Sequence, residues 1–116
     1  IAKAAFNCNP IVIDVDEDKL KLALENGAIA AINPTDEDAM MKVFEITGGN
    51  ASVAIDFVGS ELSTGFGINL LRKGGKYIIV GLYGGELKLP LPLIPIMERG
   101  IQGSYTGSPG DMHELM

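Results

Sequence analysis

The chain has 116 residues and a formal net charge of −6, and hydrophobic residues make up 47% of it, a balance typical of one globular domain of ordinary size. The negative charge argues against nucleic-acid and anionic membrane partners, because both would repel it, and no apolar stretch reaches the roughly 18 residues of a membrane span. A single cysteine, Cys8, excludes an internal disulfide, so we expect a reduced, cytoplasmic setting.

Strand and helix patterns alternate along the chain. We predict strands at 11–15, 28–33, 52–57, 76–83 and 100–107, and helices at 16–26, 35–47 and 61–72. Thr35 followed by Asp38 resembles a capping box, and Ser60 is a candidate cap of the third helix. Gly65 and Gly67 lie inside that helix at a cost of about 1 kcal/mol each, unless close packing against the sheet needs small residues. The alternating order predicts a parallel sheet wrapped by helices.

An acid ends the first predicted strand, in the stretch IVIDVDEDKL (11–20). Asp16, Glu17 and Asp18 are explained by the partly positive start of a helix. Asp14 lies instead at the carboxyl edge of the strand, where a dinucleotide-binding fold places the acid that accepts hydrogen bonds from the adenosine ribose. Its carboxylate would repel a 2′-phosphate, so the position predicts NAD rather than NADP.

The spacing around Asp14 bears on the extent of the domain. A phosphate-binding glycine fingerprint is expected about 20 residues before such an acid, and counting back runs past Ile1. We therefore predict an α/β fold with a Rossmann-type doubly wound parallel sheet that is incomplete, its first strand and glycine loop missing from this chain. Residues 1–116 would form a partial dinucleotide-binding domain. The strands at 11–15 and 28–33 would lie on one side of the missing central strand, and the other three on the far side.

Four segments carry a resemblance to a known family. NPIVIDVDEDKLKLALENGAIAAINP, ASVAIDFVGS, LLRKGGKYIIVGLYGGELKLPL and RGIQGSYTGSPGDMHEL resemble, in order and spacing, the cofactor domain of medium-chain zinc-type alcohol dehydrogenases. The resemblance implies NAD as cofactor and hydride transfer between an alcohol or polyol and nicotinamide. It also implies a catalytic zinc held by a separate domain that is absent from this chain. Within the chain, Cys8 and His113 have no partners at ligand spacing. We expect no catalytic or metal-binding residue here, and no activity from the fragment alone.

The resemblance also implies a set of cofactor-binding residues. Asp14 would bind the ribose with Lys19 beside it, and Phe57 and Val58 would line the cofactor cleft. Backbone groups near the nicotinamide would come from two further strand ends, at Val80, Gly81, Leu82, Ser104, Tyr105 and Thr106. Competing interpretations are a solvated helix charge for Lys19, core positions for Val80 and Leu82, and a packing role for Tyr105.

Three other functions remain open from the sequence: an NAD-sensing regulatory module, a zinc-free quinone reductase relative, and an S-adenosylmethionine-dependent methyltransferase, whose fold also places a ribose-binding acid after its second strand. The proline-stiffened apolar segment 89–97 predicts a homo-oligomer formed through the edge region 89–105. The alternative is a loop folded back on its own core.

Overall fold

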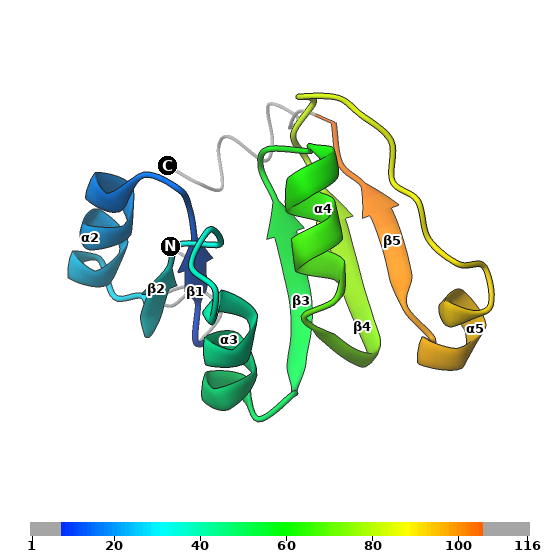
Figure 1. Ribbon diagram of the computed structural model, residues 1–116, viewed down its shortest axis with the longest axis horizontal. Coiled ribbons are helices and arrows are strands. Elements are labelled where there is room, and N and C mark those ends of the chain that lie inside the picture. Colours follow the sequence, from blue (N-terminus) through cyan, green and yellow to red (C-terminus); the bar gives the residue numbers. More distant parts are fainter. Residues whose placement is uncertain (1–7, 106–116) are drawn as a thin grey trace, which may run out of the picture. The chain divides into compact units, whose positions relative to one another are not determined.

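The computed structural model describes residues 8–105, and the chain divides into two compact units, Ile1–Gly49 and Asn50–Met116. The first unit contains, in chain order, β1 (Ile11–Ile13), α2 (Glu17–Glu25), β2 (Ala30–Ile32) and α3 (Ala39–Thr47). Its two strands are parallel, with Ile11 opposite Ala30 and Ile13 opposite Ile32 (Figure 1). This is the strand–helix–strand–helix order that the sequence predicted.

Local chemistry explains where the helices of the first unit begin. The Asp16 carboxylate accepts hydrogen bonds from the backbone N–H groups of Asp18 and Lys19, which confirms it as the cap of α2. The predicted capping box at Thr35 and Asp38 is wrong. The Thr35 hydroxyl and N–H both donate to the Asn33 side chain, so Thr35 belongs to a turn and α3 begins four residues later, at Ala39.

The second unit is a three-stranded parallel sheet with two helices. Its elements are β3 (Ala51–Asp56), α4 (Glu61–Ile68), β4 (Leu71–Ile79), α5 (Leu93–Met97) and β5 (Gly100–Gly103). The strand order is β3-β4-β5, and α4 lies over β3 and β4 (Figure 1). Among the described residues, β1 pairs with β2 alone and β3 with β4 alone, so each of these strands keeps an unpaired edge.

Several strand and helix boundaries of the second unit differ from the prediction, and one helix was missed. Helix α4 ends at Ile68 rather than near residue 72, because Leu71 already pairs with Ala51 of β3. Strand β4 ends at Ile79, and residues 80–83, predicted as strand, form a loop. The missed helix α5 contains Pro95, which is tolerated because the first turn of a helix leaves its N–H groups without intrahelical partners.

The core of the second unit forms where α4 crosses the sheet. Ile68, Leu71 and Tyr77 are buried, and Ala54, Ile79 and Leu89 pack against them. Leu62 of α4 does not take part in this core, because 87% of the residue is exposed. The helix instead buries Thr64, Gly67 and Ile68, so its small residues face the sheet.

The two helical glycines have different surroundings. A Cβ added at Gly67 would lie 2.6 Å from Cε2 and 2.8 Å from the hydroxyl oxygen of Tyr77, whereas one added at Gly65 would meet nothing within 4 Å. Close packing therefore explains Gly67, as the sequence suggested, but it does not explain Gly65.

This contrast predicts opposite effects for two alanine substitutions. Gly67→Ala should lower the free energy of unfolding by about 1–3 kcal/mol, because the buried Tyr77 ring has no room to move away. Gly65→Ala should raise it by up to about 1 kcal/mol through helix propensity. Urea unfolding followed by circular dichroism measures both, and equal effects of the two substitutions would contradict the packing explanation.

Candidate functional site

The carboxyl ends of the three strands in the second unit meet at one edge of the sheet. The register places Asp56 of β3 opposite Ile79 of β4, and Ile79 opposite Gly103 of β5. The segments that follow the three strands therefore begin side by side. They carry seven of the predicted cofactor-binding residues: Phe57, Val58, Val80, Gly81, Leu82, Ser104 and Tyr105.

Backbone hydrogen bonds continue beyond the strands and join these segments. The Asp56 carbonyl accepts from the N–H groups of Val80 and Gly81, at 2.9 and 3.1 Å. The Val58 carbonyl accepts from Tyr83, and the Gly59 carbonyl from Gly84, both at 3.1 Å. On the other side of β4, the Ile79 carbonyl accepts from Ser104 at 2.9 Å. The loops 57–59 and 80–84 thus form one connected backbone structure.

These two loops touch backbone to backbone at Gly59 and Gly81. A Cβ added at Gly59 would lie 1.9 Å from the Gly81 carbonyl oxygen, and one added at Gly81 would lie 2.2 Å from the Val58 carbonyl carbon. Gly59 also has a positive φ of 68°, which side chains disfavour. Both positions therefore require glycine, and Gly81, predicted from the sequence as a cofactor contact, has this structural reason as well.

Exposure separates the predicted side chains into two groups. Phe57, Leu82 and Tyr105 are 75%, 76% and 75% exposed, so among the described residues Leu82 is outside the core and Tyr105 packs little against the chain. Val80 is half-buried in the chain alone. Thr106 lies outside the described residues. A cofactor role for the exposed residues stays a prediction, and their exposure leaves their surfaces accessible to a ligand.

The buried carboxylate of Asp56 lies beneath the loop 57–59. The sequence did not predict Asp56 as a site residue. Asp56 is 7% exposed, and its Oδ1 accepts hydrogen bonds from the N–H groups of Val58 and Gly59, both at 2.9 Å. Its Oδ2 accepts from the Ser63 hydroxyl at 2.7 Å and from the Tyr77 hydroxyl at 2.6 Å. An acid at a strand end, followed three residues later by Gly59, was the available sequence signal.

The same contacts set the electrostatics of the buried pair. Burial by itself would raise the pKa of Asp56, but the hydrogen bonds from Tyr77, Gly59, Ser63 and Val58 outweigh it and hold the pKa below its ordinary value of 3.8. Burial, together with the hydrogen bond to the Asp56 carboxylate and its charge, raises the pKa of Tyr77 far above 10.0. The pair is therefore a carboxylate with a neutral phenol at neutral pH.

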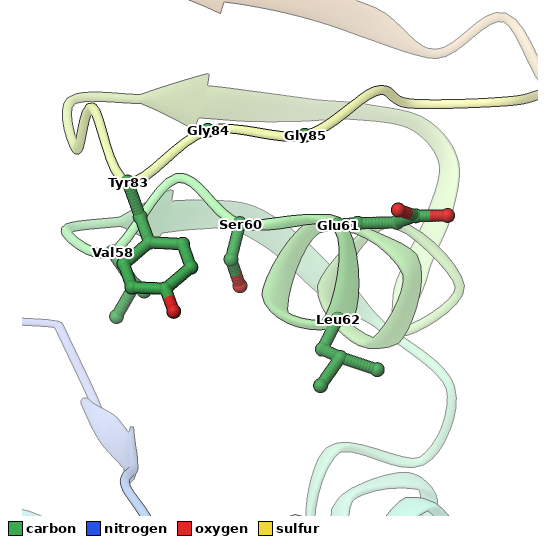
Figure 2. A pocket seen from close by; sticks show the side chains of 7 residues that line it. All are labelled: Val58, Ser60, Glu61, Leu62, Tyr83, Gly84 and Gly85. Carbon is green, nitrogen blue, oxygen red and sulfur yellow. The ribbon is translucent and has the colours of Figure 1, made fainter.

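A pocket opens beside these loops, at the start of α4. Its volume is about 390 Å³, which is within the range of small-molecule sites. Figure 2 shows the segment through Gly84 and Gly85 running alongside Ser60 and Glu61, in agreement with a bridge between Ser60 and Gly84. The pocket is lined by Val58, Ser60, Glu61, Leu62, Tyr83, Gly84 and Gly85. Only Val58 was predicted as a site residue, although Ser60, Tyr83, Gly84 and Gly85 lie in the segments that carry the family resemblance.

In the first unit, Asp14 follows β1 directly and is half-buried. Its N–H donates to the Ile32 carbonyl at 3.2 Å, and its Oδ1 accepts from the Asp16 N–H at 2.9 Å. Among the described residues, no hydrogen bond reaches the other carboxylate oxygen, Oδ2. Lys19 is exposed in the first turn of α2. An acceptor oxygen without a protein partner at a strand end fits the donor hydroxyls of a ribose.

The described residues do not fit a zinc site. Between residues 8 and 105, no three His, Cys, Asp or Glu side chains gather as metal ligands. Cys8 is an exposed free cysteine, and His113 lies outside the described residues. Within the same range, no helix is long and apolar enough to cross a membrane.

Comparison with known proteins gives one consistent result. The family model described as zinc-binding dehydrogenase matches residues 1–116. An NAD-dependent alcohol dehydrogenase of Sulfurisphaera tokodaii is 37% identical over the whole chain, and an erythritol/L-threitol dehydrogenase of Mycolicibacterium smegmatis is 37% identical over 91% of it. The chain covers 34% and 30% of these two proteins, so it spans about a third of the length of its relatives.

Solved structures agree with these matches. The alcohol dehydrogenase of Aeropyrum pernix superimposes with a TM-score of 0.89 at 38% identity, over 98% of this chain and 33% of that protein. The D-arabinose dehydrogenase of Sulfolobus solfataricus gives 0.85 at 29% identity, over 98% and 35%. The predicted fold class, an incomplete Rossmann-like parallel α/β fold, is confirmed.

The Asp56 network predicts a specific acid sensitivity. Because the pKa of Asp56 is lower in the folded protein than the 3.8 of the unfolded chain, its ionisation stabilises the fold fully above that value. This contribution is lost as the pH falls below 3.8 toward the folded-state pKa. The stability difference between the wild type and Asp56→Asn, measured by urea unfolding, should therefore shrink between neutral pH and about pH 3. A difference that does not change with pH would contradict the assignment.

Proposed function

Because the chain belongs to the zinc-binding dehydrogenase family, we propose that it is the cofactor-binding part of an NAD-dependent, zinc-type alcohol or polyol dehydrogenase. The full protein would transfer hydride between a small-molecule alcohol and nicotinamide. The observation that carries the proposal is the edge where three parallel strands end, with two loops in backbone contact at Gly59 and Gly81. Ligands of open α/β sheets bind outside the carboxyl ends of the strands.

Both units would contribute residues that contact the cofactor. In the first unit, the Asp14 carboxylate would accept hydrogen bonds from the adenosine ribose, and Lys19 would lie nearby. In the second unit, the exposed Phe57 and Val58 would line the cleft. Val80, Gly81, Leu82, Ser104, Tyr105 and Thr106 would border the nicotinamide, partly through backbone groups. NAD supplies the carbon that accepts or donates hydride, and this chain's residues would orient it.

Zinc would be held outside the described residues, by the separate domain that the family resemblance implies. There the metal would act as a Lewis acid on the alcohol oxygen. The chain described here would contribute cofactor binding only, and by itself it would have no activity. The substrate class rests on relatives named as alcohol, polyol and sugar dehydrogenases.

The other functions considered receive less support. A methyltransferase is disfavoured because the family match covers the whole chain. An NAD sensor or a zinc-free quinone reductase relative would share the cofactor contacts, and metal analysis of the full-length protein separates them from the proposed enzyme. We also propose a cytoplasmic location, with no nucleic-acid or membrane partner.

The proposed homo-oligomer rests on the region 89–105. Leu91 is 82% exposed, and Leu93, Ile96 and Ile101 are also exposed large apolar residues of this region. Among the described residues, β5 pairs with β4 alone, so its outer edge is available for another strand. An exposed apolar segment beside an open strand edge favours self-association.

Coenzyme preference tests the role of Asp14. The full-length protein should bind NADH more tightly than NADPH, and Asp14→Ala should reduce the ratio of the two affinities about tenfold, equivalent to about 1.4 kcal/mol, because the charge that repels a 2′-phosphate is lost. Titration of nucleotide fluorescence measures both dissociation constants. Asp18→Ala is the matched control, since it removes a neighbouring exposed acid and should keep the ratio. An unchanged ratio in Asp14→Ala would remove Asp14 from this role.

Sedimentation tests the interface. The wild-type protein should sediment as an oligomer, and Leu91→Asp should shift it toward smaller species because a charge would be buried in the interface. Met41→Asp introduces the same charge at another exposed apolar position, in α3, and should leave the assembly unchanged. A monomeric wild type, or equal behaviour of the two variants, would contradict the assignment.

A further inference from the structure

The Asp56 carboxylate connects the core of the second unit to the loops of the candidate site. Its Oδ2 faces inward, where it accepts from the hydroxyl of Tyr77, a residue only 2% exposed, and from the Ser63 hydroxyl. Its Oδ1 holds the N–H groups of Val58 and Gly59. One oxygen is thus anchored in the core and the other fixes a loop.

The backbone of the same residue fixes the second loop. The Asp56 carbonyl accepts from the N–H groups of Val80 and Gly81, so Asp56 alone binds four N–H groups from two loops. The loop held by the carboxylate then holds the other, through the bonds from Tyr83 to Val58 and from Gly84 to Gly59. Displacing residues 57–59 would therefore displace residues 81–84 as well.

The N–H groups of Val58 and Gly59 have the Asp56 carboxylate as their acceptor. They follow the last paired residue of β3, so the strand ladder does not continue to them. Hydrogen bonds to a charged acceptor are roughly twice as strong as those between neutral groups, so the carboxylate is the acceptor that holds this turn best. Without the carboxylate, the turn would rearrange to satisfy its N–H groups.

We propose that Asp56 is a positioning residue for cofactor binding, which sets the loops 57–59 and 80–84 in the conformation that receives the nucleotide. Tyr77 and Ser63 act through it by fixing the orientation of its carboxyl group. This inference rests on the proposed function, because it assigns a role within the same cofactor site. Asp56 itself touches no cofactor in this proposal.

Amide and apolar substitutions at Asp56 have different consequences. In Asp56→Asn, the amide oxygen can still accept from Val58 and Gly59. Its NH₂ group can donate to the hydroxyl oxygens of Tyr77 and Ser63. The two hydroxyls then donate to other acceptors: Tyr77 to the Ser63 carbonyl, 3.1 Å away, and Ser63 to the Ser60 carbonyl, 3.2 Å away. Asp56→Ala provides none of these bonds. The asparagine variant should therefore restore much of the function that alanine loses.

The experiment measures the dissociation constant for NADH, the KM for NAD and the thermal midpoint of the full-length protein. Asp56→Ala should weaken NADH binding about tenfold, equivalent to about 1.4 kcal/mol, and raise the KM for NAD more than it changes kcat. Asp56→Asn should lie between the wild type and Asp56→Ala. Tyr77→Phe, which keeps the carboxylate but removes one anchor, should weaken binding by less than Asp56→Ala.

Ile68→Ala is the stability control, because it removes packing from the same core cluster and the residue belongs to neither loop. It should lower the thermal midpoint and keep the affinity for NADH. An equal loss of affinity in Ile68→Ala and Asp56→Ala would overturn the positioning role. If Asp56→Ala does not fold, the comparison of Tyr77→Phe with Ile68→Val decides, and equal affinities in these two variants would also overturn it.

The two proposals fail in different ways. A wild-type protein that binds neither NADH nor NADPH would refute the proposed function itself. A wild type that binds NADH with Asp56 variants of unchanged affinity would refute only the positioning role.

Discussion

The second unit depends on one constraint: where parallel strands end, the backbone N–H groups that follow lose their partners. The buried Asp56 carboxylate and its own carbonyl meet this demand for four N–H groups at once. The cost of burying the charge is offset by four hydrogen bonds to the carboxylate, one of them from the hydroxyl of Tyr77 in the core. The loops 57–59 and 80–84 are thereby held firmly enough for two glycine backbones to pack against each other.

The chain uses an acid at two strand ends in two different ways. Asp56 is buried, and both of its oxygens are engaged by the protein. Asp14 is half-buried and uses one oxygen to order the turn into α2, while the described residues leave the other oxygen without a partner. The first arrangement suits a structural anchor, and the second suits a ligand with hydroxyl donors. Burial and hydrogen bonding, rather than residue type, distinguish the two roles.

The alternation of strands and helices was predictable because it is written in local patterns. β-Branched runs gave the strands, and Asp16 and Ser60 cap the helices that follow them. The failures came where non-local contacts compete with local ones. The Asn33 side chain captures Thr35 and delays α3, and pairing of Leu71 with β3 ends α4 early. Helix α5 was missed because prolines dominate its local signal, although its first turn tolerates them.

By itself, the sequence determined the fold class, the family and the position of the ribose-binding candidate, because strand periodicity, helix caps and an acid directly after a strand are properties of neighbouring residues. Only the tertiary structure decided that Asp56, Ser63 and Tyr77 form one network, and that Gly59 and Gly81 require glycine. Residues 7 to 22 positions apart in sequence meet there through the register of β3 with β4 and the crossing of α4. Such contacts arise from packing, and no short stretch of the sequence encodes them.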